Sequence, residues 1–161
     1  MTTTTHSLSF KLLSMLIFAL TACSVQTSHP VSVSDGYARA TFAMAKTAAL
    51  YFTMRNESET PVTLTGVSVS TDIANEAQIH TTEMANDMMR MREITEGIIV
   101  TPGETVSFAP GGFHVMLLGL ENGLSEGNTV VLTLMFENAA DLSVTLPVKG
   151  LNKEAGHQHH H

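Results

Sequence analysis

The strongest constraint on the fold is a series of short segments rich in β-branched and aromatic residues, which are typical of strands. Clusters of Pro, Gly, Asn and Ser separate these segments and are typical of turns. No long stretch has a helical period, so the sequence predicts an all-β, antiparallel β-sandwich or small barrel with a single domain. The expected strands occupy residues 31–34, 49–55, 62–69, 97–101, 105–108, 113–118, 129–136 and 142–148.

The first 22 residues are typical of a secretory signal and not of the fold. Lys11 precedes an apolar run over residues 12–20, which is too short for a comfortable membrane-spanning helix. The run leads into Leu-Thr-Ala-Cys at residues 20–23, which resembles the lipobox of bacterial lipoproteins. We therefore predict a lipoprotein signal peptide over residues 1–22 and lipidation at Cys23. An ordinary signal peptide followed by a chance Cys is the alternative.

Lipid on Cys23 would anchor the chain to a membrane outside the cytoplasm. The expected location is periplasmic, as a membrane-anchored lipoprotein. Ser24 after the Cys favours the outer membrane by resemblance to lipoprotein sorting rules. Residues 23–30 are polar and are expected to form a tether, which leaves residues 31–150 for the folded domain.

Composition excludes several classes of function. Acidic residues outnumber basic ones 15 to 8, giving a formal charge of −7, so nucleic acid is not an expected partner. The single Cys excludes an internal disulfide framework and any site that needs two thiolates from one chain. The sequence has no nucleophile motif, no phosphate-binding Gly loop and no paired carboxylates in a recognisable context, so an enzyme is not expected.

Two clusters of His and Met are the candidate functional residues. The first begins at His80 and continues through the Met-rich run at residues 88–91, and the second is His114 with Met116. Residues i and i+2 of a strand project from one face, so His114 and Met116 should point the same way. Met89 and Met91 form a second pair of this kind.

The two clusters are expected to meet through two connections. Polar residues 81–87 are expected to form a loop that brings His80 back beside the Met-rich strand. Residues 97–101 and 105–108 are expected to form a hairpin between the clusters. The predicted site therefore contains two imidazoles and two or three thioethers.

This set of ligands favours monovalent copper. Thioethers are soft, neutral ligands that suit Cu(I), and imidazole also binds copper. Zinc would be expected to bring Cys or a carboxylate, and calcium or magnesium would need oxygen ligands. Taken singly, a Met at strand spacing is more often core filler. We expect that role for Met44, Met54 and Met135, and a loop or core position for Met84 and Met88.

The pattern resembles the bacterial periplasmic copper chaperone family PCu(A)C, whose motif is a His, a Met some distance on, and then His-x-Met. Here ten residues separate His80 from Met91, and twenty-two separate Met91 from His114 in His114-Val-Met116. The flanking segments at residues 102–106, 109–120 and 127–136 match as well. The sequence departs from the family at residues 37–39, where many members have Trp, and at Asp87, where a turn Gly is common.

The resemblance implies a cupredoxin-like β-sandwich, described as a Greek-key barrel, and a copper chaperone that supplies cytochrome oxidase assembly. The implied partners are a cytochrome oxidase subunit or a thioredoxin-like assembly factor. Met89 is the substitute if Met91 is not a ligand. The implied Cu(I) ligands are His80, Met91, His114 and Met116.

The C-terminal residues 151–161 are polar and are expected to form a disordered tail. Three consecutive His are fewer than an expression tag usually has, so we interpret the tail as native. His-rich tracts bind divalent metals, and in this family such extensions resemble a second, Cu(II)-capturing site. The candidate ligands of this second site are His157, His159, His160 and His161.

Three other functions compete with copper delivery. An electron-transfer cupredoxin would need a Cys thiolate beside two His, but the only Cys lies in the lipobox. A copper-storage or resistance protein would use the same ligands as a chaperone. A structural or adhesive β-sandwich lipoprotein would bind no metal tightly.

Overall fold

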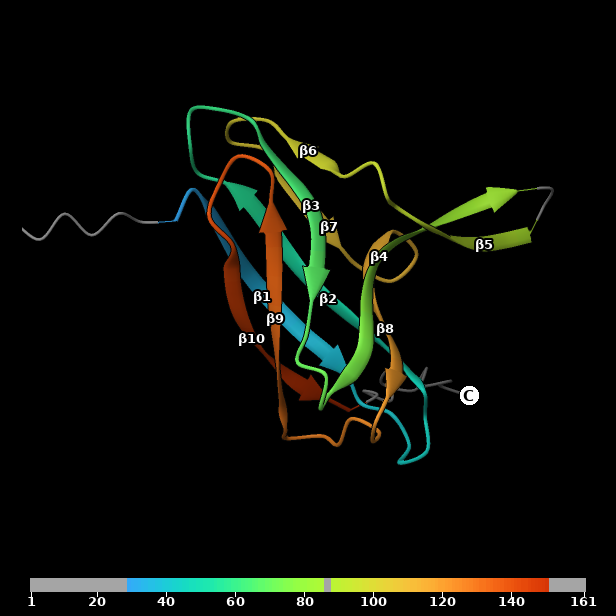
Figure 1. Cartoon of the computed structure of the whole chain (residues 1–161). Helices are drawn as coiled ribbons and strands as arrows, with labels where there is room; N and C mark the ends of the chain where they lie inside the picture. Colours follow the sequence, from blue (N-terminus) through green and yellow to red (C-terminus); the bar gives the residue numbers. More distant parts are fainter. Residues whose placement is uncertain (1–28, 86–87, 151–161) are drawn as a thin grey trace, which may run out of the picture.

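Ten strands make up the part of the chain that the computed structural model describes, residues 29–85 and 88–150 (Figure 1). The expected signal peptide, the lipidation site and the His-rich tail lie outside these residues. Within them, no helix has the length and apolar character needed to cross a bilayer. The strands are β1 (Val31–Arg39), β2 (Thr47–Asn56), β3 (Val62–Ser68), β4 (Ala74–Ala85), β5 (Met88–Glu93), β6 (Ile98–Val100), β7 (Thr105–Phe108), β8 (Phe113–Leu120), β9 (Thr129–Phe136) and β10 (Leu142–Lys149).

The strands follow one hydrogen-bonded order, β5-β4-β8-β7-β2-β1-β10-β9-β3-β6. β10 pairs with β1 on one side and with β9 on the other, so it joins two layers. β1 to β10 and β7 to β8 are parallel pairs, and the other ladders are antiparallel. The predicted β-sandwich is confirmed, with these two parallel pairs added.

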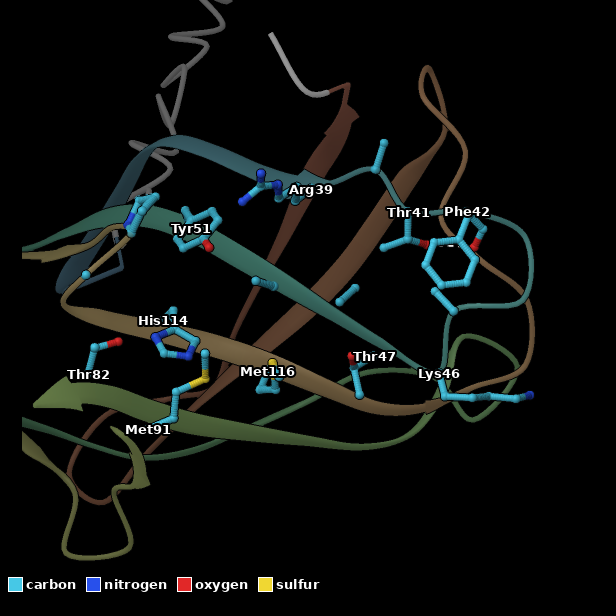
Figure 2. Close-up of a pocket in the computed structure, with 16 residues that line it drawn as sticks. Arg39, Thr41, Phe42, Lys46, Thr47, Tyr51, Thr82, Met91, His114 and Met116 are labelled. Atoms are coloured by element: carbon cyan, nitrogen blue, oxygen red, sulfur yellow. Dashed lines mark hydrogen bonds between the residues drawn. The ribbon is translucent and has the colours of Figure 1, made fainter. Parts of the chain in front are cut away.

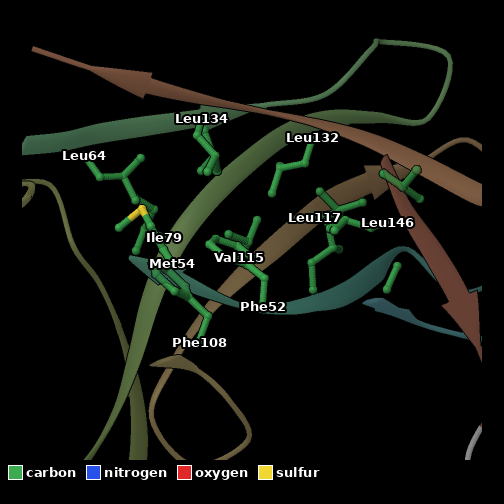
Figure 3. Close-up of a cluster of buried hydrophobic side chains, with 14 of the residues drawn as sticks. Phe52, Met54, Leu64, Ile79, Phe108, Val115, Leu117, Leu132, Leu134 and Leu146 are labelled. Atoms are coloured by element: carbon green, nitrogen blue, oxygen red, sulfur yellow. The ribbon is translucent and has the colours of Figure 1, made fainter. Parts of the chain in front are cut away.

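The hydrophobic core lies between the layers, with side chains from β3 and β9 facing those of β2, β7 and β8 (Figure 3). Alternate residues of each strand point inward, as the period of a strand requires. The rings of Phe52 and Phe108 stack in this core with centroids 4.2 Å apart. Because the inward residues of β4, β8 and β2 fill the core, the outward positions of these strands are available for side chains with other roles. The largest fully buried side chains are Phe52, Phe108, Leu50, Met54, Leu64, Leu117, Leu120, Leu132 and Leu134.

A short excursion over residues 40–46 connects β1 to β2 and is tied to the segment that follows β8. Thr41 N donates to Leu124 O at 2.9 Å, and Gly123 N donates to Ala43 O at 3.0 Å. A Cβ at Gly123 would collide with the backbone of Phe42, so this close approach requires glycine. The excursion is thereby held as a wall beside the outer faces of β2 and β8.

Expectations for two connections and for four methionines are wrong. Residues 97–101 and 105–108 do not form a hairpin, because β6 pairs with β3 and β7 pairs with β2. Residues 81–85 are not a loop but the continuation of β4, which forms a hairpin with β5.

Met44 is not in the core, because its side chain is 83% exposed on the excursion. Met84 and Met88 are neither in a loop nor in the core, because they are 67% and 54% exposed on β4 and β5. Met135 is only half-buried, on the face of β9 that points away from the core. Met54, in contrast, is fully buried as expected.

Candidate metal centre

The two histidines meet because β4 and β8 are direct neighbours in the sheet. His80 on β4 is the register partner of His114 on β8. Partners on an antiparallel ladder share a face, so both rings project on the side away from the core, with centroids 5.8 Å apart. Gln78 and Met116 form the next pair along the same face. The ladder alone therefore gathers two imidazoles and a thioether.

Met91 joins this group from β5, on the other side of β4. It is the register partner of Thr82, which lies two residues from His80 and so on the same face of β4. Figure 2 shows the sulfur of Met91 beside the ring of His114, with Met116 further along β8. The four residues predicted from the sequence thus lie on one face, contributed by three adjacent strands.

Met89 shares the face of Met91 but lies further from the histidines. It pairs with Met84 near the end of the hairpin, two positions beyond the Thr82 and Met91 pair. Met91 is therefore better placed than Met89 to approach the two imidazoles. Met88 pairs with Ala85, on the opposite face of the hairpin.

Each imidazole is oriented by a hydrogen bond from one ring nitrogen. His114 Nδ1 donates to Gly112 O at 3.1 Å, and His80 Nε2 donates to Gln78 Oε1 at 2.9 Å. The amide of Gln78 is itself oriented, because its Nε2 donates to Glu76 Oε1 at 2.8 Å. An acceptor oxygen at one ring nitrogen places the proton there and leaves a lone pair on the other.

The two nitrogens that carry the lone pairs are buried and have no hydrogen-bond partner. They are Nε2 of His114 and Nδ1 of His80. The residue His114 is only 4% exposed, and neither nitrogen atom presents accessible surface to the solvent. A buried polar atom without a partner costs about 1–3 kcal/mol. A group that accepts both lone pairs would remove this cost, and a metal ion is the usual partner of imidazoles whose other ring nitrogen is hydrogen-bonded in this way.

The environment of His80 favours the neutral imidazole. Burial lowers the pKa of His80 below its ordinary value of 6.5, and the neighbouring His114 lowers the pKa further. Glu93, its partner on β5, acts in the opposite direction and raises the pKa. Neutral imidazole is the form that binds metal, so the net shift keeps His80 ready to act as a ligand.

A cavity of about 470 Å³ opens next to the site (Figure 2). The excursion at residues 40–46 lines one side, and the turn before β8 lines another. Met91 is 62% exposed, whereas His114 lies at the buried end of the group. The site is therefore closed on the imidazole side and open on the side of the β5 thioether. The cavity is lined by Met91, His114 and Met116 together with Arg39, Lys46, Tyr51, Thr82, Pro110 and Gly111 among others.

The donor set that gathers here is neutral and contains sulfur. Two imidazoles and two thioethers share the face, and Glu93 is the neighbouring carboxylate on β5. Over residues 29–85 and 88–150, no group of three or more His, Cys, Asp or Glu side chains is arranged to hold a metal ion. The chemistry that this group can offer is soft coordination of a low-charge ion.

Sequence reasoning missed the residues that orient the imidazoles. Gln78 lies two residues before His80, so period-two spacing would have found it if residues 74–85 had been interpreted as a strand. Gly112 acts through its main-chain oxygen, which also accepts from Thr82 N at 3.2 Å. A main-chain oxygen leaves no residue-type signal in the sequence.

Comparison with known proteins identifies the family. Residues 31–148 match the family described as "Putative lipoprotein LpqE-like". The chain belongs to this family. This LpqE-like chain is 30% identical over 159 residues to the protein of Leifsonia xyli subsp. xyli described as "Putative lipoprotein Lxx21020", covering 92% of this chain and 93% of the relative. The family and this relative indicate an extracytoplasmic, membrane-anchored protein, while the outer membrane in particular stays a prediction.

Solved structures of PCuAC domains share the fold of this LpqE-like chain. The copper-bound PCuAC domain from PmoF2 is 26% identical, with a TM-score of 0.61 over 75% of this chain and 93% of that domain. The Cu(I) form of DR1885 from Deinococcus radiodurans is 29% identical, with a TM-score of 0.56 over 78% of this chain and 83% of that protein. The predicted membership of the PCuAC family and the cupredoxin-like sandwich are confirmed.

Proposed function

We propose that this LpqE-like protein is a Cu(I)-binding chaperone that acts outside the cytoplasm. The observation that carries the proposal is the pairing of His80 with His114, each with one buried ring nitrogen that lacks a partner. Similarity to copper-bound PCuAC domains supports the choice of metal. The proposed ligands are Nδ1 of His80, Nε2 of His114 and the sulfur atoms of Met91 and Met116.

The chemistry of these ligands suits a carried ion. Neutral nitrogen and thioether donors leave the single charge of Cu(I) in place, and they do not attract hard divalent ions as carboxylates do. Thioethers also cannot cross-link through disulfides, which form readily outside the cytoplasm. Weak, neutral bonds can be exchanged one at a time, so the ion can pass to another protein without a redox step.

Exposure of the proposed ligands gives the transfer a direction. His114 is buried and held by Gly112 O, so this bond should be the last to break. Met91 is 62% exposed on the edge strand β5, so a partner can reach it first. An incoming ligand would replace the Met91 sulfur and then work inward toward the imidazoles.

The proposed destination is the copper centre of a terminal cytochrome oxidase, with an oxidase subunit or a thioredoxin-like assembly factor as the partner. This assignment is supported by the resemblance to the PCuAC family. Lipid on Cys23 would keep the chaperone at the membrane where an oxidase is assembled. The lipoprotein description of the Leifsonia xyli relative supports this anchor.

X-ray absorption of protein loaded anaerobically with Cu(I) tests the site. We expect one tightly held ion with nitrogen and sulfur neighbours in similar number, and loss of one sulfur neighbour in Met116→Leu. A spectrum with nitrogen and oxygen neighbours alone would contradict the proposal. For delivery, the loaded protein is mixed with the apo copper domain of a cytochrome oxidase subunit. Copper that stays on the chaperone at every ratio of chaperone to oxidase domain would instead indicate storage.

The histidines at residues 157, 159, 160 and 161 are proposed as a separate Cu(II)-capturing site. The support is compositional, because His-rich tracts bind divalent metals. Deletion of residues 156–161 should weaken uptake of Cu(II) and leave the Cu(I) affinity unchanged. Unchanged Cu(II) stoichiometry after the deletion would contradict this second site.

A further inference from the structure

Two more methionines lie on the metal-binding face of the β4–β5 hairpin, beyond the proposed site. Met84 and Met89 are register partners, and each is 67% exposed. The hairpin extends away from the body of the sandwich, so neither side chain packs in the core (Figure 1). Large apolar side chains gathered on a small exposed surface are unusual and indicate an interaction.

The two faces of the hairpin differ beyond the pair of His80 and Glu93, which share the face of the proposed ligands at its base. The face that carries the proposed ligands also carries Met84, Met89 and the uncharged Thr82. The opposite face carries Glu83, Arg90 and Arg92, and Arg92 Nε lies 3.5 Å from Glu83 Oε2. Among the described residues of the hairpin, the pair farthest out on this face is Met84 with Met89, and neither is charged.

Spacing on this face brings three sulfur atoms within reach of one ion. Register partners have Cβ atoms about 4.5–5.5 Å apart, which is the relation of Met84 to Met89. Met89 and Met91 are two residues apart on one strand, a separation of about 6.5–7 Å. The flexible Met side chain adapts readily to its neighbours, so its sulfur can close such gaps.

We propose that Met84, Met89 and Met91 form a second Cu(I) site at the exposed part of the hairpin, through which the ion reaches or leaves the main site. The inference rests on the proposed function, because Met91 would belong to both sites. Transfer between them is a ligand exchange: on the way in, bonds from Cu(I) to Met84 and Met89 break as bonds to His80, His114 and Met116 form, and the Met91 bond is kept. On the way out the same exchange runs in reverse. No electron is transferred, and the thioethers bind and release no proton.

The test uses the full protein with methyl-labelled Met, titrated under anaerobic conditions with Ag(I) as a redox-stable probe and then with Cu(I). The first equivalent should shift the methyl signals of Met91 and Met116. A second, weaker equivalent should shift those of Met84 and Met89. The double variant Met84→Leu/Met89→Leu should keep the first equivalent and lose the second.

Met88→Leu is the matched control, because Met88 is 54% exposed on the other face of the same hairpin. This variant should keep both equivalents and should load Cu(I) faster than the double variant does. Methyl signals of Met84 and Met89 that stay unchanged while Met91 and Met116 respond would overturn the second site and leave the main site standing. A first equivalent that moves neither Met116 nor the imidazole signals would overturn both.

Discussion

Nε2 of His114 and Nδ1 of His80 are both buried without a hydrogen-bond partner, on rings that lie side by side across the β4–β8 ladder, tilted by 50° with centroids 5.8 Å apart. The opposite nitrogen of each ring is held by an oxygen, Gly112 O for one and Gln78 Oε1 for the other. Both lone pairs are therefore fixed before any ion arrives. This pre-organisation reduces the ordering that binding would otherwise require.

Replacing a proposed ligand should lower Cu(I) affinity without unfolding the protein. We expect His114→Ala and Met116→Leu each to weaken binding by about a hundredfold, or ~2.7 kcal/mol, measured by competition with a Cu(I) chelator. The control is Met135→Leu, because Met135 lies on β9 in the other layer. Equal affinities for Met116→Leu and Met135→Leu would remove Met116 from the ligand set.

Gln78 should matter through the orientation of His80. Loss of the 2.9 Å hydrogen bond in Gln78→Leu frees the imidazole to rotate and to change its protonated nitrogen. Removing an orienting partner of this kind typically costs about 10–100-fold in metal affinity. Gln78→Glu keeps an acceptor oxygen and should restore most of the affinity. If both variants bind as the unchanged protein does, the hydrogen bond has no role in binding.

Replacing Met54 should have the opposite effects from replacing Met116, because it should lower stability and leave Cu(I) affinity unchanged. The side chain of Met54 is fully buried between the layers, so Met54→Ala should lower the free energy of unfolding by about 2–5 kcal/mol. The Cu(I) affinity of the folded variant should be unchanged, because Met54 lies on the core side of β2. Chemical denaturation and chelator competition on the same samples separate the two effects. A large loss of affinity at full stability would contradict the assignment of Met54 to the core.

Acid should weaken both the apo fold and copper binding through His80. The folded pKa of His80 lies below 6.5, so the unfolded chain takes up a proton first as the pH falls. The stability that this residue contributes is therefore full above pH 6.5 and is lost as the pH falls through the folded pKa. Cu(I) affinity should likewise persist at pH 6.5 and fall only below it, because neutral imidazole is the ligand.

Glu93 offers a way to shift this pH dependence. Glu93 raises the pKa of His80, so Glu93→Gln should lower that pKa further and extend Cu(I) binding to more acidic solutions. The pKa is followed by NMR titration of the His80 ring in the apo protein. Glu137→Gln is the control, because Glu137 follows β9, which is not a neighbour of β4, β5 or β8 in the strand order. A rise in the His80 pKa in Glu93→Gln would contradict the expected sign.

Period-two patterns predicted most of the strands, and Met54 is buried in the core as expected. On β9 the inward residues Val130, Leu132 and Leu134 are buried, whereas Val131 is 52% exposed on the other face. The residues of the site could also be named from the sequence, because His114 and Met116 share a face in any strand. The connection that the sequence predicted between these residues and His80 was wrong. The expected hairpin of residues 97–101 and 105–108 does not exist, and direct pairing of β4 with β8 brings the clusters together.

The strand β4 was missed for a physical reason. Its residues have low β-propensity at both ends, with Ala74, Asn75, Glu76 and Ala77 at the start and Glu and Ala near the end. Pairing with β8 on one side and β5 on the other overrides that local preference. Such long-range pairing is not encoded in a local window. The hydrogen bond from His114 to Gly112 O is likewise a property of the folded backbone.

The direction of β1 determines how far the copper-binding end stands from a lipid surface. β1 begins at Val31, near the point where the expected tether joins the domain, and ends at Arg39 on the wall of the cavity. Its 9 residues span about 25 Å at the rise of an extended chain. For a chain fastened through Cys23, the strand would act as a spacer that holds the proposed copper site clear of the bilayer.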